Sequence, residues 1–177
     1  MKIIVGLGNP GDRYKTTRHN AGWIILDWLI MDLGFKIEDF RLEKKYDSEI
    51  LKTENILFIK PQTYMNESGT AIGKIIKFTN SNITDLFIIH DEIDLPLGDV
   101  RLYGGEGTAG HQGIESIKET LGFGFTRLRI GIENRAEYRI PPTEDYVLQN
   151  FSDEELKKLK EEVFPKVKLE IEKFLAN

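Results

Sequence analysis

Apolar residues recur along the chain with two spacings, one typical of strands and the other typical of helices. Short runs rich in β-branched residues predict buried strands, and apolar residues three and four apart predict helices. The expected strands are Lys2–Leu7, a hairpin of Arg41–Thr53 and Ile56–Lys60 with Glu54 and Asn55 at its turn, Leu86–His90, Val100–Tyr103 and Leu128–Ile132. The expected helices are Asn20–Leu33, Ser68–Phe78, Gln112–Leu121 and a last helix that begins at a capping box of Ser152 and Glu155 and that Pro165 should break or bend.

Strands that alternate with helices indicate an α/β fold around a twisted, largely parallel sheet. Neither a linker nor an internal repeat divides the sequence, so residues 1–177 are expected to form a single domain. In such folds ligands bind beyond the carboxyl ends of the strands. This rule points to the segments 8–19, 90–98 and 104–113, which follow expected strands.

Composition narrows the function without deciding it. The chain has no cysteine, which excludes disulfides, thiol catalysis and cysteine-ligated metal sites. It shows neither an apolar run long enough to span a membrane nor a signal peptide, so a cytoplasmic location is expected. Its 24 basic and 29 acidic residues give a net charge of −5. This charge does not favour a nucleic acid as partner, but positions 12–18 and 127–139 are locally basic and keep one possible.

The segment Gly6–Gly11 has the glycine spacing of a dinucleotide-binding loop directly after an expected strand. In a dinucleotide site a helix begins within that motif and points its N-terminus at the pyrophosphate. Here Pro10 and a polar run follow, and helical periodicity resumes only near Asn20. A loop that holds polar side chains in a cleft is the favoured interpretation, in which the amides of Asn9 and Asn20 are candidate contacts for a peptide-like ligand.

The three histidines of the chain all fall near the ends of expected strands or in the loops that follow them. His19 closes the first polar loop, His90 and Asp91 end a strand, and His111 lies in a glycine-rich turn. Histidine suits a general base at neutral pH, and a carboxylate such as Asp91 can orient its ring. A metal site of His19, His90, His111 and Asp91 is a competing interpretation, although no pair has the i, i+4 spacing of a helical metal site. A third interpretation is that all three histidines are purely structural.

The segment Lys60–Gly69 joins an expected strand to an expected helix. Its polar residues can serve simply to cap that helix, with Tyr64 and Met65 packed in the core. Alternatively, Tyr64 forms an apolar wall and Asn66 an amide donor at the mouth of the same cleft. The residues alone leave both interpretations open.

Five blocks of the sequence, taken in order, resemble those of bacterial peptidyl-tRNA hydrolases. They are GLGNPG, Tyr14 and TRHNAG within 6–22, KPQTYMNESG at 60–69, HDEIDLPLG at 90–98, GHQG at 110–113 and RLRIGI at 127–132. The resemblance implies a monomeric esterase, without metal or cofactor, that cleaves the bond between a peptide and the 3′ ribose of tRNA. It also implies a mixed sheet wrapped by helices, with the C-terminal helices over one side.

The resemblance further implies roles for individual residues. His19 matches the family's catalytic base, Asp91 the carboxylate that supports it, and Asn9 the amide that separates N-blocked peptidyl substrates from free aminoacyl ones. Residues that match contacts to the peptide or the tRNA are Tyr14, Tyr64, Asn66, His111 and Arg129, the last being half of a basic pair that holds the 5′ phosphate.

The chain departs from the family pattern at two positions. Gln112 stands where the family typically has Asn, which retains an amide for substrate but moves it outward. Tyr103 stands where many members have the Lys of the phosphate pair, so that Arg101 is the expected second cation. Three alternatives remain. A non-catalytic RNA-binding relative would be recognised by an assay of hydrolysis, and a dinucleotide-binding protein by titration with NAD. A structural interaction domain leaves the polar loops after the strands unexplained.

Overall fold

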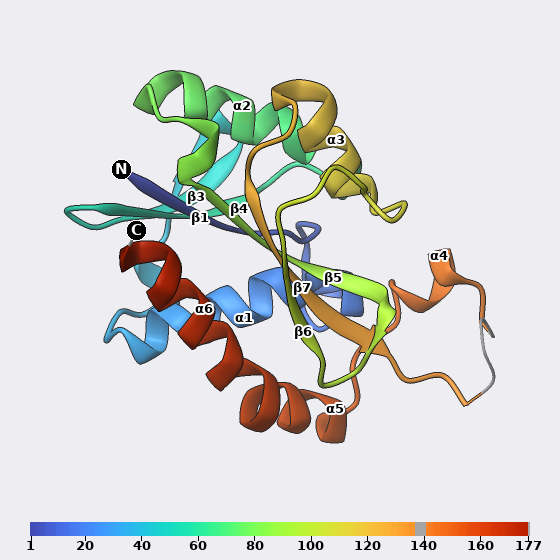
Figure 1. The fold of residues 1–177 in the computed structure, drawn as a ribbon. Coiled ribbons are helices and arrows are strands. Elements are labelled where there is room, and N and C mark those ends of the chain that lie inside the picture. The colour runs from blue at the N-terminus through green and yellow to red at the C-terminus, as the bar shows by residue number, and fades with distance from the viewer. Residues whose placement is uncertain (137–140, 177) are drawn as a thin grey trace.

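Within residues 1–136 and 141–176, which this computed structural model describes, seven strands form one mixed sheet (Figure 1). The strands are β1 (Lys2–Gly6), β2 (Arg41–Glu43), β3 (Ser48–Lys52), β4 (Ile56–Pro61), β5 (Leu86–Pro96), β6 (Val100–Tyr103) and β7 (Thr126–Glu133). Their order across the sheet is β2-β3-β4-β1-β5-β7-β6. The central strands β4, β1, β5 and β7 are parallel, and antiparallel strands extend both edges. The expected α/β fold with a mixed, largely parallel sheet is confirmed.

Strand β1 lies in the middle of the sheet and supplies apolar side chains to both of its faces. Ile4 belongs to the core on one face, whereas Ile3 and Val5 belong to the core on the other, and all three are fully buried. A central parallel strand is covered on both faces, which explains why its sequence is a continuous apolar run.

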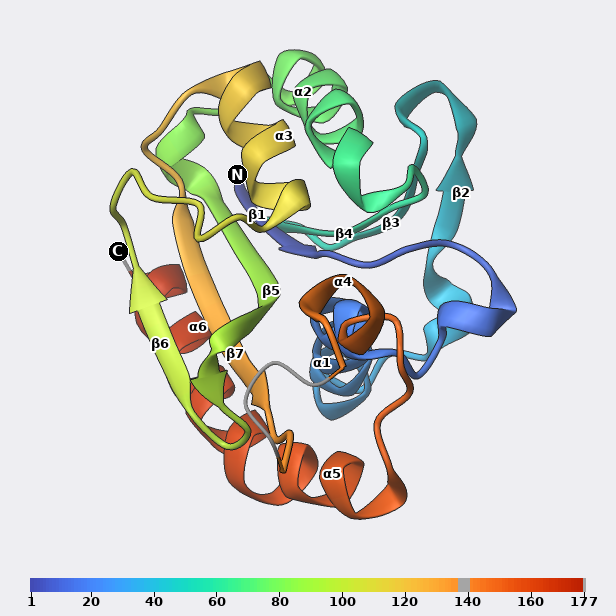
Figure 2. The same ribbon diagram turned by 90° about the vertical axis from the view of Figure 1, so that its right-hand side faces the viewer.

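Helices cover both faces of the sheet (Figure 2). On one face lie α1 (Ala21–Asp32), α5 (Asp153–Lys158) and α6 (Phe164–Ala176), and on the other lie α2 (Ser68–Thr79) and α3 (Gln112–Leu121). The expectation that the C-terminal helices cover one side is confirmed. The short helix α4 (Thr143–Tyr146) and short 3-10 turns complete the described elements. The 3-10 turns are η1 (Asp12–Tyr14), η2 (Arg18–Asn20), η3 (Ile37–Asp39), η4 (Lys44–Tyr46), η5 (Met65–Glu67) and η6 (Ile83–Asp85).

Strand β5 is longer than its apolar run predicts. It continues to Pro96, so His90 and Asp91 lie inside the strand and the expectation of a loop from position 90 was wrong. Pairing with β7 continues through Glu92. Because that pairing uses backbone groups, it does not require apolar side chains.

Two other expectations need correction. The first arm of the hairpin is divided into β2 and β3 by η4, because Asp47 adopts a left-handed conformation, with φ of 46°, and reverses the chain. For the last helix the sequence predicts a break or a bend at Pro165, and the structure shows no break there. Instead, α5 continues through a π-helical stretch, η7 (Leu159–Val163), into α6. The π turn ends two residues before the proline, whose missing N–H removes one hydrogen bond from the helix.

The glycine-rich segment Gly6–Gly11 does not have the geometry of a dinucleotide loop. The chain forms η1 at Asp12 after leaving β1, and the first α-helix begins only at Ala21. No helix in the described part of the chain is long and apolar enough to cross a bilayer.

Close packing of α1 on the sheet generates a test of this fold. A β-carbon on Gly22 would lie 2.3 Å from the carbonyl oxygen of Ile89 and 2.5 Å from the amide nitrogen of Leu7, both backbone atoms of the core. We therefore expect Gly22→Ala to lower the free energy of unfolding by about 1–3 kcal/mol, the range for overpacking, as measured by urea denaturation. Gly104→Ala is the matched control, since nothing lies within 4 Å of its added carbon. An equal loss in both variants would contradict the close-contact explanation.

Candidate active site

A cleft of about 530 Å³ opens beside the carboxyl ends of the central strands. Its walls come from the loop after β1, the segment before α2, the far part of β5, the start of α3 and the segment around α4. The residues predicted from the sequence that line it are Asn9, Tyr14, His19, Tyr64, Asn66, Asp91, His111 and Gln112. Asn20, Arg101 and Arg129 do not line this cleft.

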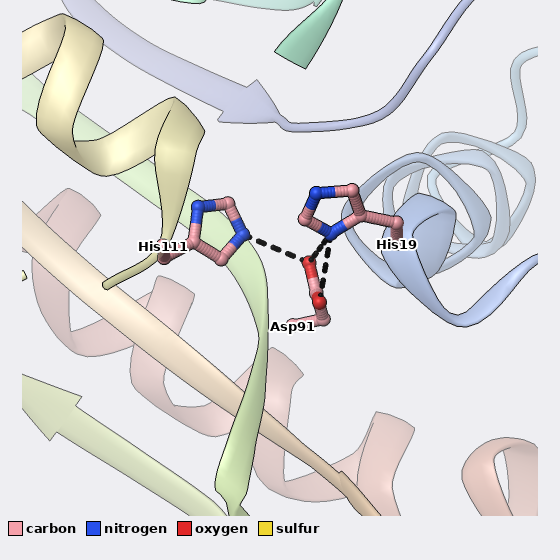
Figure 3. A group of neighbouring side chains, drawn as sticks. All are labelled: His19, Asp91 and His111. Carbon is pink, nitrogen blue, oxygen red and sulfur yellow. Dashed lines mark hydrogen bonds and ion pairs between the residues drawn. The ribbon is translucent and has the colours of Figure 1, made fainter. Parts of the chain in front are cut away.

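Asp91 lies between two histidines at the base of the cleft (Figure 3). The Nδ1 atom of His19 is 2.9 Å from each carboxylate oxygen of Asp91, and Nε2 of His111 is 2.9 Å from its Oδ1. Asp91 is only 2% exposed. A buried carboxylate persists only where donors replace the lost water, and here the donors are two imidazole rings.

The ring of His111 is fixed by the backbone of α3. Its Nδ1 accepts hydrogen bonds from the amide nitrogens of Gly113 and Ile114, at 3.1 and 3.3 Å, and thereby caps the helix. A nitrogen that accepts from backbone N–H groups carries no hydrogen, so in the neutral ring the hydrogen is on Nε2. His111 therefore donates to Asp91, and the start of α3 decides which nitrogen does so.

His19 is oriented in turn by Asp91. Its Nδ1 faces the carboxylate and donates to it, so its Nε2 has no hydrogen in the neutral ring. In Figure 3 this second nitrogen points away from Asp91. The ring belongs to the cleft lining, which leaves Nε2 placed as a proton acceptor for a group bound there.

In the buried pair of His19 and Asp91, each residue has a pKa shifted toward its charged form. Burial lowers the pKa of His19, but the charge of Asp91 and the hydrogen bond to it outweigh burial, and the net pKa is raised above the ordinary value of 6.5. Burial raises the pKa of Asp91, yet the charges and hydrogen bonds of His19 and His111 hold it far below its usual range. Asp91 is therefore an anion whenever His19 acts as a base.

His90 is not part of this arrangement although it precedes Asp91. It is fully buried, and its Nδ1 donates to the carbonyl oxygen of Asp91 at 2.7 Å. Burial, together with the nearby His111, lowers its pKa well below 6.5. His90 is a neutral, structural histidine that helps to fix the backbone at Asp91.

The direction of the hydrogens argues against the metal-site interpretation. His19, Asp91 and His111 have donor atoms within 4.8 Å of one another, which is compatible with the size of a metal site. However, a ligand nitrogen must offer a lone pair, and Nε2 of His111 carries the ring hydrogen because Nδ1 accepts from two backbone amides. Instead, the side chains of His19 and His111 each form hydrogen bonds with Asp91.

Comparisons with known proteins agree with this geometry. The sequence profile of the peptidyl-tRNA hydrolase family matches residues 3–177. The chain belongs to the peptidyl-tRNA hydrolase family. It is 38% identical to the peptidyl-tRNA hydrolase of Lactobacillus delbrueckii subsp. bulgaricus over 99% of this chain and 94% of that protein. It is 44% identical to that of Mesoplasma florum over 90% of this chain and 85% of that protein.

Solved structures support the same assignment. The peptidyl-tRNA hydrolase of Acinetobacter baumannii superposes with a TM-score of 0.81 and 32% identity, over 99% of this chain and 91% of that one. Hydrolysis of peptidyl-tRNA is the activity of this family, and the chain is an enzyme of that kind.

Two asparagines fix the loop after β1. The side chain of Asn20 exchanges hydrogen bonds with the backbone of Asn9, at 2.9 and 3.0 Å, and is 1% exposed. Asn20 is thus a brace for the loop rather than a group that faces the cleft. The Oδ1 atom of Asn9 accepts from the amide of Met65 at 2.8 Å. Its Nδ2 is therefore the part of Asn9 left to meet a ligand, as a donor.

The remaining cleft walls include residues that the sequence did not indicate. Tyr14, Tyr64, Asn66 and Gln112 line the cleft as predicted, and Tyr64 is 53% exposed. The additional lining residues are Met65, Glu92, Ile93, Ala109, Gly110, Thr143, Glu144, Val147 and Leu148. For the cleft wall near α4, the sequence offers one local indication. It is the apolar pair at 147–148, which lies in a polar stretch without clear periodicity.

A cationic face lies on β6 and β7 next to the cleft. Arg129 makes an ion pair with Glu92 at 2.8 Å, and Glu92 itself lines the cleft. Arg101 is the cross-strand partner of Arg129 and is largely exposed, so the two side chains project from the same face of the sheet. Tyr103 lies over the guanidinium groups of Arg127 and Arg129, at 4.6 and 5.4 Å from its ring centre. Positions 137–140 of the second basic stretch lie outside the described residues.

The opposite environments of the histidines can be tested by titration. We expect NMR to show that His19 has a pKa above 6.5, whereas His90 remains neutral over the same pH range. In Asp91→Asn the raising charge is lost while burial remains, so the pKa of His19 should fall below 6.5. A pKa of His19 below 6.5 in the unaltered protein, or unchanged in Asp91→Asn, would contradict the proposed coupling.

Proposed function

We propose that His19 is the general base in the hydrolysis of the ester bond that links a peptide to the 3′ ribose of tRNA, releasing the peptide and recycling the tRNA. The observation that carries the proposal is the hydrogen bonding of His19, whose Nδ1 faces Asp91 and donates to it, so that Nε2 is the nitrogen without a hydrogen in the neutral ring. Asp91 supports the base by stabilising its charged form. A positioned general base contributes about 10²–10⁴ in rate.

In the proposed reaction, Nε2 of His19 takes a proton from a water molecule as the water oxygen bonds to the ester carbonyl carbon. The carbonyl oxygen becomes negatively charged, and the amide of Asn66 or Asn9 is the candidate donor to it. One such donor is typically worth about 10²–10³ in turnover. The bond to the ribose oxygen then breaks, and protonated His19 returns the proton to that oxygen. The products are tRNA and a peptide with a free carboxyl group.

Asn9 is proposed to select substrates whose amino group is blocked. Because its Oδ1 already accepts from Met65, Asn9 presents an N–H donor, which suits the carbonyl oxygen of a peptide. A free α-amino group is cationic and has only donors, so it gains nothing from this group and is repelled by it.

The tRNA is proposed to bind across the cleft and the cationic face. Tyr14 would stack on the 3′ end, Tyr64, His111 and Gln112 would contact the bound end, and Arg101 and Arg129 would hold a phosphate. We also propose that the protein acts without a metal ion, as a monomer and in the cytoplasm. The hydrogen-bond donation by His111 supports the absence of a metal from the mechanism.

The role of His19 predicts a selective loss of turnover. We expect His19→Ala to bind peptidyl-tRNA as the unaltered protein does but to hydrolyse it at least about 100-fold more slowly. The measurement is release of labelled peptide from an N-blocked aminoacyl-tRNA, with binding followed separately. Cleavage at the normal rate would remove His19 as the base. An unaltered protein that binds this substrate without cleaving it would favour the non-catalytic RNA-binding alternative.

The role of Asn9 predicts a change in selectivity. Asn9→Asp keeps an oxygen that accepts from Met65 but replaces the N–H donor with a negatively charged oxygen. We expect the ratio of kcat/KM for N-blocked over free aminoacyl-tRNA to fall about 10–100-fold, which corresponds to one lost hydrogen bond and an unpaired polar group. Asn66→Asp is the comparison variant, and an equal fall in that variant would show that the effect is not specific to Asn9.

A further inference from the structure

Arg18, the neighbour of His19, forms a buried ion pair that the mechanism above does not use. One terminal nitrogen of its guanidinium, Nη2, donates to both carboxylate oxygens of Glu155, at 3.0 and 2.8 Å. Arg18 is 7% exposed and Glu155 is 8% exposed. The two residues are 137 positions apart, so the pair joins the beginning of the chain to the first turn of α5.

Glu155 connects several elements through its two oxygens. Besides Arg18, Oε1 accepts from the side-chain amide of Asn134 at 3.1 Å, and Oε2 accepts from the amide nitrogen of Ser152 at 2.8 Å. Burial raises the pKa of Glu155, but these hydrogen bonds and the charge of Arg18 together lower it below its ordinary value. Glu155 is therefore ionised and holds the end of β7, the start of α5 and the loop of His19 together.

Arg18 in turn holds the chain between α4 and α5. Its other terminal nitrogen, Nη1, donates to the carbonyl oxygens of Gln149 and Asn150, at 3.2 and 2.8 Å. The guanidinium lies 4.2 Å from the ring centre of Tyr146, whose hydroxyl donates to the carbonyl oxygen of Ile132. The segment beside the cleft is thus tied to Arg18 by charge, hydrogen bonds and ring contact.

The same segment is bonded to the backbone that carries His19. The amide of His19 donates to the carbonyl oxygen of Val147 at 2.8 Å, and the amide of Arg18 donates to that of Gln149 at 3.0 Å. Val147 and Leu148 line the cleft. Residues 147–149 are therefore bonded to the backbone that carries His19 and also contribute an apolar part of the cleft wall.

Stability alone does not explain this arrangement. Removing two charges from water is costly, and replacing a buried ion pair with apolar residues of similar size is often neutral or stabilising. A pair with this many directed hydrogen bonds does, however, fix the position of its members. One member is Arg18, and its fixed position limits the movement of the adjacent His19.

We propose that Arg18 and Glu155 are positioning residues for the hydrolysis, which hold His19 against Asp91 and hold the Val147–Leu148 wall against the bound peptide. The inference rests on the proposed role of His19 as the base. Neither residue lines the cleft, so both act through the backbone of residues 17–19 and 147–151. A shift of about 1 Å in a catalytic group can lower turnover about 10²-fold.

The deciding variant replaces both partners, Arg18→Met with Glu155→Met. This change leaves no unpaired charge, so we expect the fold to be retained, with a lower urea midpoint because the polar groups bonded to Arg18 and Glu155 lose their partners. Methionine cannot hold the carbonyl oxygens of Gln149 and Asn150. We therefore expect kcat to fall about 10–100-fold, KM for the peptidyl substrate to rise, and the pKa of His19 to move down toward 6.5. Because the net charge is unchanged, that pKa shift reports position rather than a lost charge.

Two further variants complete the experiment. Asp32→Asn is the control, since it breaks the ion pair with Lys168 that joins α1 to α6, and kcat and the pKa of His19 should not change. Arg18→Lys keeps the charge beside Glu155 but cannot reproduce the guanidinium contacts, so it should lower kcat in the same direction as the double variant. It decides the question if the double variant does not fold.

A folded double variant with unaltered kcat and an unaltered pKa of His19 would overturn the proposal. So would an Arg18→Lys variant with full kcat, or a fall in kcat that follows only the folded fraction and includes Asp32→Asn. The titration of His19 needs no substrate. A protein that proves not to cleave peptidyl-tRNA would therefore refute the general-base role, while the pKa of His19 in the double variant would still test the positioning.

Discussion

The buried charge of Asp91 is the constraint on which the site depends. A carboxylate that is 2% exposed needs donors, and two histidine rings from segments far apart in the sequence supply them. A series of hydrogen bonds that starts at the backbone of α3 determines which nitrogen of His19 faces the cleft. The first amides of α3 set the hydrogen of His111, His111 and His19 then both donate to Asp91, and Nε2 of His19 is left free to accept a proton. Hydrogen bonds among these side chains thus orient the ring of His19.

The fold was largely predictable because its core strands are apolar on both faces. Ile3, Ile4 and Val5 predict a central strand directly, and the rule that ligands bind at the carboxyl ends of parallel strands points to the edge of the sheet where the cleft opens. The pattern of apolar residues did not predict the structure where backbone pairing or a local backbone conformation decides it. The polar residues after Ile89 continue β5 because β7 lies beside them, and the turn at Asp47 depends on a left-handed backbone.

The candidate site was predictable to the level of residue type but not of orientation. A histidine in the loop after one expected strand and an aspartate at the expected end of another indicate a base and its support, and the family resemblance selected which ones. Which atom of each amide faces the ligand could not be predicted, because it depends on contacts such as that from Met65 to Asn9. Asn20 shows the consequence, since an amide that sequence assigned to the ligand is used entirely to brace a loop.

The turn that carries His19 explains how three such contacts coexist. Consecutive side chains of a 3-10 helix point about 120° apart, because three residues complete one turn. In η2 these directions lead from Arg18 to Glu155 of α5, from His19 to Asp91 of β5, and from Asn20 to the loop of Asn9. All three side chains are buried, so a shift of the turn by one residue would leave three polar groups without partners at once. His19, the proposed base, occupies the middle of the turn, so its backbone lies between two residues whose side chains are anchored to other elements.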